Sequence, residues 1–442
     1  MSAQDTARKV VDAVTRLAKN AEAIAHVREG ASAYVRFAAG ELTTSGASDV
    51  NAVSLTVALG RRHATVTTNQ QDDASLTALA ARAVEVARLA PEDPEWVPVA
   101  RAQAFPSSPQ AHDPQTRAQP PQARAAVART AIALSKANDV IVAGFYEAGG
   151  HDTHLATSAG LAASHSQSVA RLTVTARSGD ATGSGWAGAE ETKSSVVDAR
   201  ATSEQAIAKC LRSRRPTTLA PGRYDVVLEP AAVGELVSFL TDALDARAAD
   251  EGRSFLSRKT GSAVGERLFS PCVTLRSDPT DAATASATFD RHGSPLRPTT
   301  WIEDGTLKTL RTSRFWGKKN GADPTGEPNT WCLSGGTSAS VDALVKQVER
   351  GLLVTRFWYC RWLDEKSLMV TGLTRDGVFL IERGEVTSPV NNFRFNDSPA
   401  RVLANIAGMT ARGARVPSRD GIVRMPAVAA AGFNMASASA AV

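Results

Sequence analysis

The stretch from Gly351 to Ser398 constrains the fold more than any other part of the chain. It holds three runs rich in apolar and aromatic residues, which are Leu352–Tyr359, Leu368–Thr371 and Val378–Ile381. Glycines interrupt the stretch at Gly372, Asp376-Gly377 and Gly384. Asp-Gly favours turns because glycine accepts a positive φ at little cost. This much apolar bulk is typical of a core, so the stretch predicts an antiparallel meander in a barrel or sandwich.

The length and composition indicate a globular protein with more than one core. A chain of 442 residues is long for a single core, and we expect two domains. The apolar content of 43% and the charged content of 21% are ordinary. The net charge is +5, but no window holds five Lys or Arg in a row. A nucleic-acid-binding surface needs a concentrated basic stripe, so that class of function is disfavoured.

The first half of the chain predicts the same pattern twice. The first copy is a helix from Asp5 to about His26, strands at Ala31–Phe37, Ala52–Leu59 and His63–Thr68, and a helix from the N-cap Asp73 to before Pro91. Eight prolines in residues 91–121 then predict an extended strap. The second copy is a helix at Ala123–Lys136, strands at Val140–Tyr146, near Leu155 and at Val169–Thr175, a turn at Gly149-Gly150, and a helix at Val197–Leu211.

The predicted fold class is therefore α+β, with two domains. Residues 1–217 form the pseudo-duplicated helix–strands–helix domain, and the linker Arg212–Pro221 follows it. Residues 218–442 form a β-rich domain of barrel or sandwich type. Its expected elements outside the meander are a strand at Tyr224–Leu228, a helix at Ala231–Arg247 and a short helix near Arg401–Met409.

The histidines and cysteines do not form a recognisable metal motif. His151 and His154 are the only close pair, and their odd separation puts them on opposite faces of a strand. The four cysteines lack C-x-x-C spacing, which favours a reducing compartment. The N-terminus lacks the pattern of a signal peptide, and polar residues interrupt the Ala-rich C-terminal tail. We therefore expect a cytoplasmic protein without a membrane span.

Carboxylates provide the remaining candidates for catalysis. Glu229 and Glu235 flank the start of the predicted helix at Ala231, and Pro230 suits its first turn. Glu229 is thus expected at the N-cap, where the helix dipole stabilises an anion. Arg375-Asp376 is expected at the tip of a turn. The residues alone do not assemble a catalytic constellation.

Short motifs spread through the second half carry a family resemblance. They are Gly252-Arg253-Ser254-Phe255, Lys259-x-Gly261, Asp278-Pro279, Phe289-Asp290-x-x-Gly293, Ile302–Leu307, Gly351–Thr355, Thr371-Gly372 through Gly384-Glu385, Pro389-Val390 and Arg424–Pro426. In this order and spacing, over most of residues 218–435, the chain resembles the TldD/TldE family of peptidase proteins, also called the TldD/PmbA family.

The resemblance implies which of two kinds of member this chain is similar to. The TldD type carries a helix with H-E-x-x-x-H and a later cysteine, which bind zinc, and the TldE type lacks them. Here the two His positions hold Glu229 and Gly234, the Glu position holds Pro230, and the segment Arg419–Met425 has no cysteine. A site of three zinc ligands and an open water position cannot form from these residues. The chain resembles the TldE side.

A TldE-like chain is expected to hold no metal or cofactor of its own. Zinc is expected in a TldD-type partner, with which the chain would form a heterodimer that degrades or processes unfolded peptides. The peptide would add as a strand to a sheet edge, and the candidate residues for contacting it are Arg253, Thr371, Arg375 and Asp376.

Two other functions stay open at this stage. The chain could be a free-standing homodimeric hydrolase or amidase that has replaced the zinc site. Its candidate residues would be Glu229, Glu235, Arg253, Arg375 and Asp376. It could also be a non-enzymatic protein that binds extended peptides.

Overall fold

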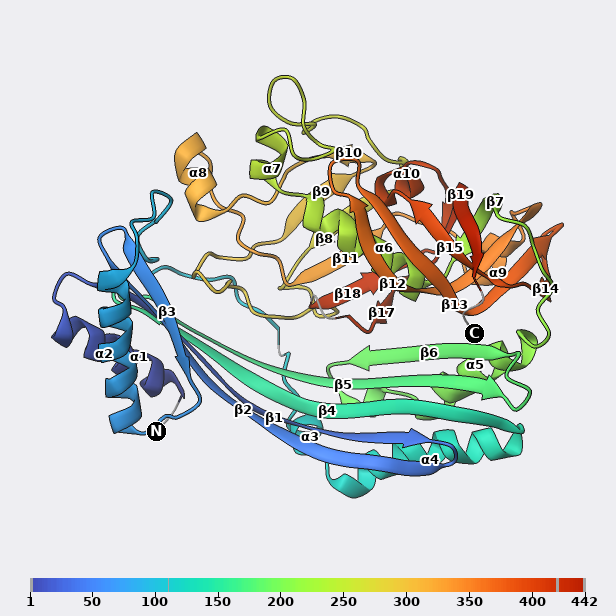
Figure 1. Ribbon diagram of the computed structural model, residues 1–442, viewed down its shortest axis with the longest axis horizontal. Helices are drawn as coiled ribbons and strands as arrows, with labels where there is room; N and C mark the ends of the chain where they lie inside the picture. Colours follow the sequence, from blue (N-terminus) through green and yellow to red (C-terminus); the bar gives the residue numbers. More distant parts are fainter. Residues whose placement is uncertain (1–2, 110, 419–420, 440–442) are drawn as a thin grey trace.

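Two β-rich halves stack on each other (Figure 1). The computed structural model describes residues 3–109, 111–418 and 421–439. The first half is built on one six-stranded antiparallel sheet with the strand order β3-β2-β1-β4-β5-β6. Its strands are β1 (Glu22–Ala38), β2 (Glu41–Leu59), β3 (Arg62–Thr68), β4 (Val140–Thr157), β5 (Ala162–Ser178) and β6 (Ser184–Glu191).

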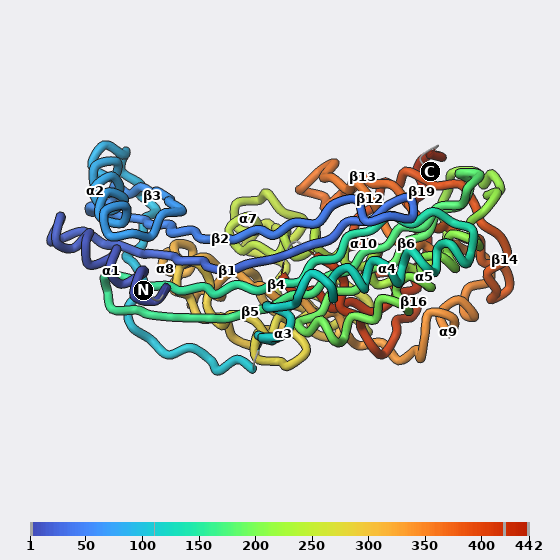
Figure 2. The backbone as a smooth tube through the Cα atoms, turned by 90° about the horizontal axis from the view of Figure 1, so that it is seen from below, coloured from blue at the N-terminus to red at the C-terminus, as the bar shows by residue number. Residues whose placement is uncertain are grey.

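The helices of the first half sit at opposite ends of the long strands (Figure 2). They are α1 (Ala3–Leu17) and α2 (Asp73–Leu89) at one end, and α4 (Pro121–Ala137) and α5 (Ala199–Arg212) at the other. Each pair buries its own apolar cluster against the sheet. Helix, three strands and helix therefore occur twice, and the predicted pseudo-duplication is confirmed.

Three details of the first half differ from the prediction. The first helix ends at Leu17 and not near His26, because Ala23, Ala25 and Val27 alternate into the core as part of β1. The N-cap of α2 is Asp72, whose carboxylate accepts a hydrogen bond from the Ser75 amide at 2.9 Å. The strand β6 was not predicted.

The turn predicted at Gly149-Gly150 is wrong, because β4 runs through both glycines. A Cβ on Gly149 would lie 2.4 Å from the Ala31 carbonyl oxygen, and one on Gly150 would lie 2.7 Å from that of Gln167. Glycine is needed here for the close approach of neighbouring strands and not for a reversal.

The proline-rich strap runs between the sheet and loops of the second half. Thr157 Oγ1 donates to the Ala100 carbonyl at 2.7 Å, and the Ser168 amide donates to that of Ala111 at 3.0 Å. On the other side, Ser108 Oγ donates to the Pro279 carbonyl at 3.0 Å. The strap contains one short helix, α3 (Pro114–Arg117).

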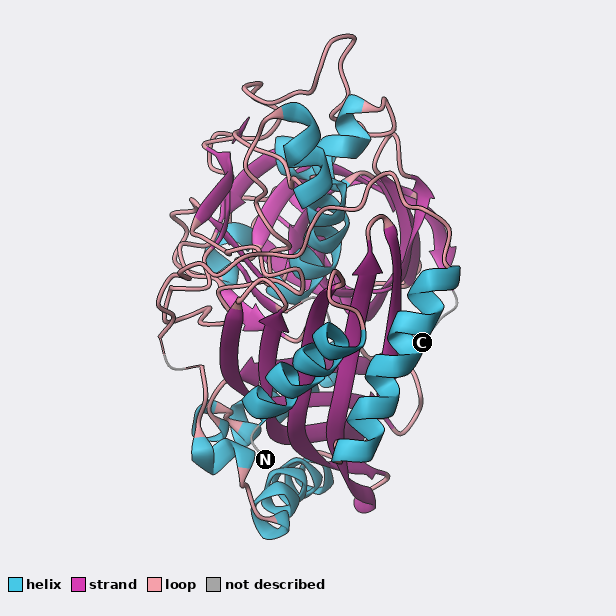
Figure 3. Cartoon of the chain, turned by 90° about the vertical axis from the view of Figure 1, so that its left-hand side faces the viewer, coloured by secondary structure: helices cyan, strands magenta, loops and turns pink. Residues whose placement is uncertain are grey.

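The second half contains a closed barrel, as predicted. Its strands β7 (Gly222–Leu228), β12 (Arg350–Asp364), β13 (Met369–Glu382), β15 (Asn392–Asp397) and β19 (Val428–Ser439) pair in the order β12-β7-β19-β15-β13, and pairing of β12 with β13 closes the ring. The strand β14 (Glu385–Pro389) pairs antiparallel with β13 and adds one more strand beside it. Viewed from the end that carries α1 and α2, the barrel stands above the long sheet (Figure 3).

A second sheet completes this half, with the order β10-β9-β8-β11-β18-β17. The helix α6 (Pro230–Ala243) packs against β12 of the barrel and β18 of this sheet. The remaining elements are α7 (Ala246–Asp250), β8 (Thr274–Ser277), β9 (Thr299–Glu303), β10 (Thr306–Leu307), α8 (Arg314–Asn320), β11 (Thr330–Ser334), α9 (Val341–Val345), α10 (Pro399–Ala404), β16 (Ile406–Met409), β17 (Ala414–Val416) and β18 (Ile422–Met425).

The meander is antiparallel, as predicted, but Asp376-Gly377 is not a turn. It lies in a bulge inside β13, since Val354 pairs with Val378 while Arg356 already pairs with Arg375. Asp376 and Gly377 have φ values of 57° and 120°, which fits the irregular backbone of a bulge. Two helix lengths were also wrong: α6 ends at Ala243, and the segment predicted as a helix to Met409 ends in the strand β16.

Candidate functional site

Several candidate residues meet where the two halves touch. The edge strand β6 and the helix α5 of the first half contact β13 of the barrel, close to the start of α6 (Figure 1). Glu229 precedes α6, Glu235 lies on it, and Arg375 and Asp376 lie on β13. The fold therefore gathers four of the six predicted site residues near this contact.

Glu229 is the N-cap residue of α6, but its carboxylate does not cap the helix. With φ −68° and ψ 161° it has the expected N-cap backbone, and no side-chain capping bond forms. Its Oε2 instead lies 2.5 Å from Lys209 Nζ of α5, and the two side chains are only 14% and 13% exposed. Lys209 also donates to the Trp186 carbonyl at 3.3 Å. The Glu229 carboxylate is therefore engaged in a largely buried ion pair.

Asp376 lies at the centre of a second buried polar cluster. Its side chain is 0% exposed, and the bulge turns it toward the first half. It accepts hydrogen bonds from the Ser184 hydroxyl of β6 and, at 2.8 Å, from Arg356 Nε of β12. Arg375 Nε lies 3.9 Å away. Asp376 is thus committed to joining the halves and does not stand at an exposed turn tip.

Aromatic rings enclose the Arg356 guanidinium. It lies 4.8 Å from the Trp186 ring centroid and 5.2 Å from the Trp358 ring centroid. Trp186 belongs to β6 of the first half and Trp358 to β12 of the second half. Burial lowers the pKa of Arg356, and the Asp376 carboxylate opposes this shift. The contact is therefore a cation held between two rings and one buried carboxylate.

Glu235 neighbours the only cysteine of the meander. Burial raises the pKa of the Cys360 thiol, and the charge of Glu235 and a hydrogen bond to it raise the pKa further. A thiol held in its protonated form is a poor nucleophile. This pair gives no support to cysteine-based hydrolysis.

Two predicted peptide-contacting residues lie apart from these clusters. Arg253 forms an ion pair with Glu251 at 2.7 Å and lines a separate pocket of about 290 Å³. Thr371 lies further along β13 and accepts a hydrogen bond from Arg394 Nη1 at 3.3 Å. The peptide-binding roles of Arg253, Thr371, Arg375 and Asp376 stay predictions.

The two histidines of β4, His151 and His154, lie in different surroundings. Burial is the main cause that lowers the pKa of His151 to about 4. His154 shares a hydrogen bond of 2.8 Å between its Nδ1 and Ser164 Oγ of β5. In the described residues, no three His, Cys, Asp or Glu side chains gather as metal ligands would.

The positions that match the zinc motif do not fit a zinc ion. Glu229 is paired with Lys209, and Pro230 has no side-chain base. A Cβ on Gly234 would lie 3.0 Å from Val416 Cγ2 and 3.8 Å from Met425 Cγ, so the place of the second ligand faces apolar side chains. β18, which holds most of the segment predicted to match the cysteine, does lie against α6. The two segments that match the ligand positions thus lie side by side, and the residues described in them do not fit a zinc ion.

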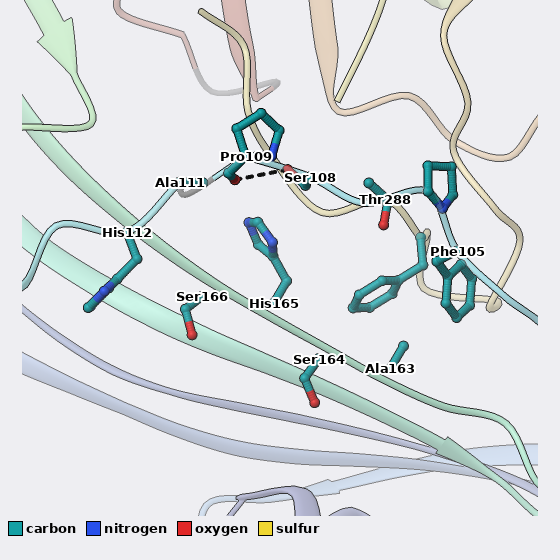
Figure 4. Close-up of a pocket in the computed structure, with 12 residues that line it drawn as sticks. Phe105, Ser108, Pro109, Ala111, His112, Ala163, Ser164, His165, Ser166 and Thr288 are labelled. Atoms are coloured by element: carbon teal, nitrogen blue, oxygen red, sulfur yellow. Dashed lines mark hydrogen bonds between the residues drawn. The ribbon is translucent and has the colours of Figure 1, made fainter. Parts of the chain in front are cut away.

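A pocket of about 480 Å³ lies elsewhere, between the strap, β5 and the loop at Thr288 (Figure 4). The ring of His165 lies beneath Ser108 and Pro109 of the strap, and its Nε2 has no hydrogen-bond partner among the described residues. Burial lowers the pKa of His165. None of the residues of the two ion-pair clusters lines this pocket.

Sequence reasoning missed the residues that complete the site. Lys209, Ser184 and Trp186 come from the first half, and Arg356 is one of many arginines in the chain. Lys209 is 20 residues from Glu229 along the chain, and Arg356 and Ser184 are 20 and 192 residues from Asp376. No local pattern marks such long-range pairs.

The fold and site define a class of protein: a long, pseudo-duplicated antiparallel sheet that carries a closed barrel, joined through buried ion pairs. Two family models match it. One is described as the PmbA/TldA metallopeptidase C-terminal domain and matches residues 221–437. The other is described as PmbA/TldA metallopeptidase domain 1 and matches residues 27–87. Together they cover more than half of the chain, and the chain belongs to the PmbA/TldD family.

Individual relatives agree with this assignment. TldE from Thermococcus kodakarensis superposes with a TM-score of 0.86 at 16% identity, over 97% of this chain and 99% of that chain. A metalloprotease from Methanothermobacter thermautotrophicus is 26% identical over 48% of this chain and 47% of its own length. A metalloprotease PmbA homolog from Haemophilus influenzae is 31% identical over 24% of each chain. The aligned parts thus span half or less of these two sequence relatives.

No helix in the described part of the chain is both long and apolar enough to cross a bilayer.

Proposed function

We propose that this chain is the non-metal-binding, TldE-like subunit of a TldD/TldE-type heterodimeric metallopeptidase that degrades or processes unfolded peptides. In this role it completes the peptide chamber around the zinc site of a TldD-type partner. The zinc belongs to the partner, and this chain holds no cofactor. We place the complex in the cytoplasm.

One observation carries the proposal: the positions aligned with the family's zinc motif hold residues that do not fit a zinc ion. Gly234 has no ligand atom and packs on Val416. Pro230 cannot act as a general base, and Glu229 is held in an ion pair with Lys209. A buried ion pair and apolar packing at these positions are what we expect in a subunit with a structural role.

A surface on the barrel supports association with a partner. Trp358, Tyr359 and Leu363 of β12 are 44%, 59% and 53% exposed. The Arg361 guanidinium lies 4.1 Å from the Tyr359 ring centroid. Exposed aromatic residues and arginine are enriched in protein interfaces, so this face of β12 is our candidate contact.

The structure gives less support to a free-standing hydrolase. Its candidate carboxylates Glu229 and Asp376 are held in ion pairs, and Glu235 bonds to a protonated thiol. A protein that only binds extended peptides would bind a peptide without cleaving it, with or without a TldD-type subunit.

The experiment measures the metal content and molar mass of the purified chain, alone and mixed with a TldD-type subunit from the same organism. We expect less than 0.1 zinc per chain, an order-of-magnitude bound for a chain without a built site. We also expect a mixed dimer in light scattering. A homodimer with one tightly bound zinc per chain would refute the proposal.

Matched variants test the candidate contact. Y359A and L363A remove exposed apolar side chains of β12 and should weaken the mixed dimer. L89A removes an apolar side chain that is 80% exposed at the far end of α2 and should leave it intact. If all three variants weakened the mixed dimer equally, this part of β12 would not be its contact surface.

A further inference from the structure

A pocket of about 390 Å³ lies between the end of the first half that carries β3 and the region around α8. Figure 1 shows α8 above this end of the long sheet. His63 of β3 and Trp96 of the strap line it, together with Arg311, Arg314 and Phe315 from the region around the start of α8. Its volume falls within the range of small-molecule sites.

Two arginines of this pocket have no carboxylate partner within the described part of the chain. Arg314 Nη2 donates to the Pro98 carbonyl at 2.6 Å, and Arg311 Nη2 donates to the Asp242 carbonyl at 3.1 Å. Burial lowers the pKa of Arg314, and Asp290 and Glu22 oppose the shift only through their charge. Both arginines are half-buried, and an anionic ligand would supply the ionic partner that their guanidinium groups lack.

The carboxylates that line the pocket are engaged by other groups. Asp93 accepts from His63 at 2.9 Å, Glu95 pairs with Arg247 at 2.7 Å, and Glu327 lies 3.2 Å from Arg291. Asp245 Oδ1 accepts from the Ala248 amide at 2.7 Å. Asp290 Oδ1 accepts from two backbone amides, those of His292 and Ser294, at 2.8 Å each.

These carboxylates do not neutralise Arg311 or Arg314, but their remaining lone pairs form an acidic rim. A rim of this kind suits an ammonium group and disfavours a dianion such as phosphate. The pocket therefore offers both signs of charge to a ligand.

The walls also offer an apolar surface and one free hydroxyl. The His63 ring stacks on Trp96 with centroids 4.5 Å apart and an angle of 28°. Phe315 also lines the pocket. Ser294 Oγ is buried and has no hydrogen-bond partner among the described residues. Stacked rings favour a flat or apolar side chain between the charged ends of a ligand.

We propose that this pocket binds a small zwitterion, namely a free amino acid or short peptide with an apolar or aromatic side chain. Its carboxylate meets Arg311 and Arg314, and its ammonium group faces the rim at Asp245 and Glu327. Its side chain lies against Trp96 and Phe315. This inference stands on the pocket alone and holds whether or not the chain is a peptidase subunit.

The test is calorimetric titration of the full chain with phenylalanine, the dipeptide Ala-Phe, N-acetyl-phenylalanine, phenylalanine amide and inorganic phosphate. We expect saturable binding of phenylalanine or Ala-Phe, which distinguishes the two sources of the same chemistry. Blocking the carboxylate or the amine should weaken binding about tenfold or more, as expected for a lost charge-assisted bond. Phosphate should not compete.

Variants locate the site. R311Q and R314Q should each weaken binding about tenfold, and R297Q, which removes an exposed arginine outside the pocket, should leave it unchanged. Thermal melting checks that each variant is folded. The proposal is overturned if neither ligand binds the wild-type chain at millimolar concentration, if the blocked ligands bind equally well, or if R297Q acts like the pocket variants.

Discussion

Replacing Asp376 by Asn tests whether the buried cluster holds the two halves together. The substitution keeps the size of the side chain and tolerates the left-handed backbone at φ 57°. It removes the charge that pairs with Arg356, whose side chain is only 17% exposed. The Arg356 cation then stays buried between Trp186 and Trp358 without a carboxylate.

The expected cost follows from the burial of this pair. Removing one partner of a buried ion pair destabilises proteins by about 3–5 kcal/mol. The residual exposure of Arg356 and its two ring contacts place D376N at the lower end, so we expect a loss of about 3 kcal/mol in the free energy of unfolding. Urea unfolding followed by tryptophan fluorescence and circular dichroism measures the loss.

An exposed pair provides the matched control. Arg200 and Glu204 lie 3.0 Å apart on α5 with side chains 66% and 53% exposed, so E204Q should cost at most about 0.5 kcal/mol. The double variant R356M/D376N also removes the buried Arg356 charge and should recover part of the loss, while Arg375, 3.9 Å from Asp376 in the native chain, keeps its charge. If D376N costs no more than E204Q, the cluster does not hold the halves together and the reasoning fails.

Three further predictions concern other buried groups. The pKa of His151 is lowered to about 4 in the folded chain, so the unfolded chain binds this proton more readily. The free energy of unfolding should therefore fall by up to about 3 kcal/mol as the pH drops from 6.5 to 4. H151Q should remove this pH dependence. Because burial raises the pKa of Cys210 to about 11, mass spectrometry should find it unlabelled by maleimide at pH 8 until the chain unfolds. G234H restores a ligand side chain but crowds Val416, so it should lower stability by about 1–3 kcal/mol without creating zinc binding in elemental analysis.

Sequence patterns were sufficient where a local rule decides the structure. The strands predicted at Ala52–Leu59 and His63–Thr68 pair as β2 and β3, and the doubled helix–strands–helix pattern matches the order of elements in the first half. Sequence patterns failed where a glycine serves strand packing or a bulge. Gly149-Gly150 and Asp376-Gly377 are sequences typical of turns. Only the pairing with neighbouring strands shows that β4 and β13 continue through them.

The candidate site was predictable in part. The vacant ligand positions at Pro230 and Gly234 follow from the resemblance alone. The ionic partners do not, because Lys209 reaches Glu229 and Ser184 reaches Asp376 only after two separate sheets have docked. The unpaired guanidinium of Arg314 is likewise visible only in three dimensions.

The central claim is that zinc chemistry belongs to a partner and not to this chain. The most direct measurement is cleavage of an unfolded peptide by the purified chain, by a TldD-type subunit from the same organism and by their mixture, each with and without a zinc chelator. We predict that the chain alone cleaves nothing, that the mixture cleaves faster than the TldD-type subunit, and that chelation abolishes the activity. Chelator-sensitive cleavage by this chain alone would contradict the account.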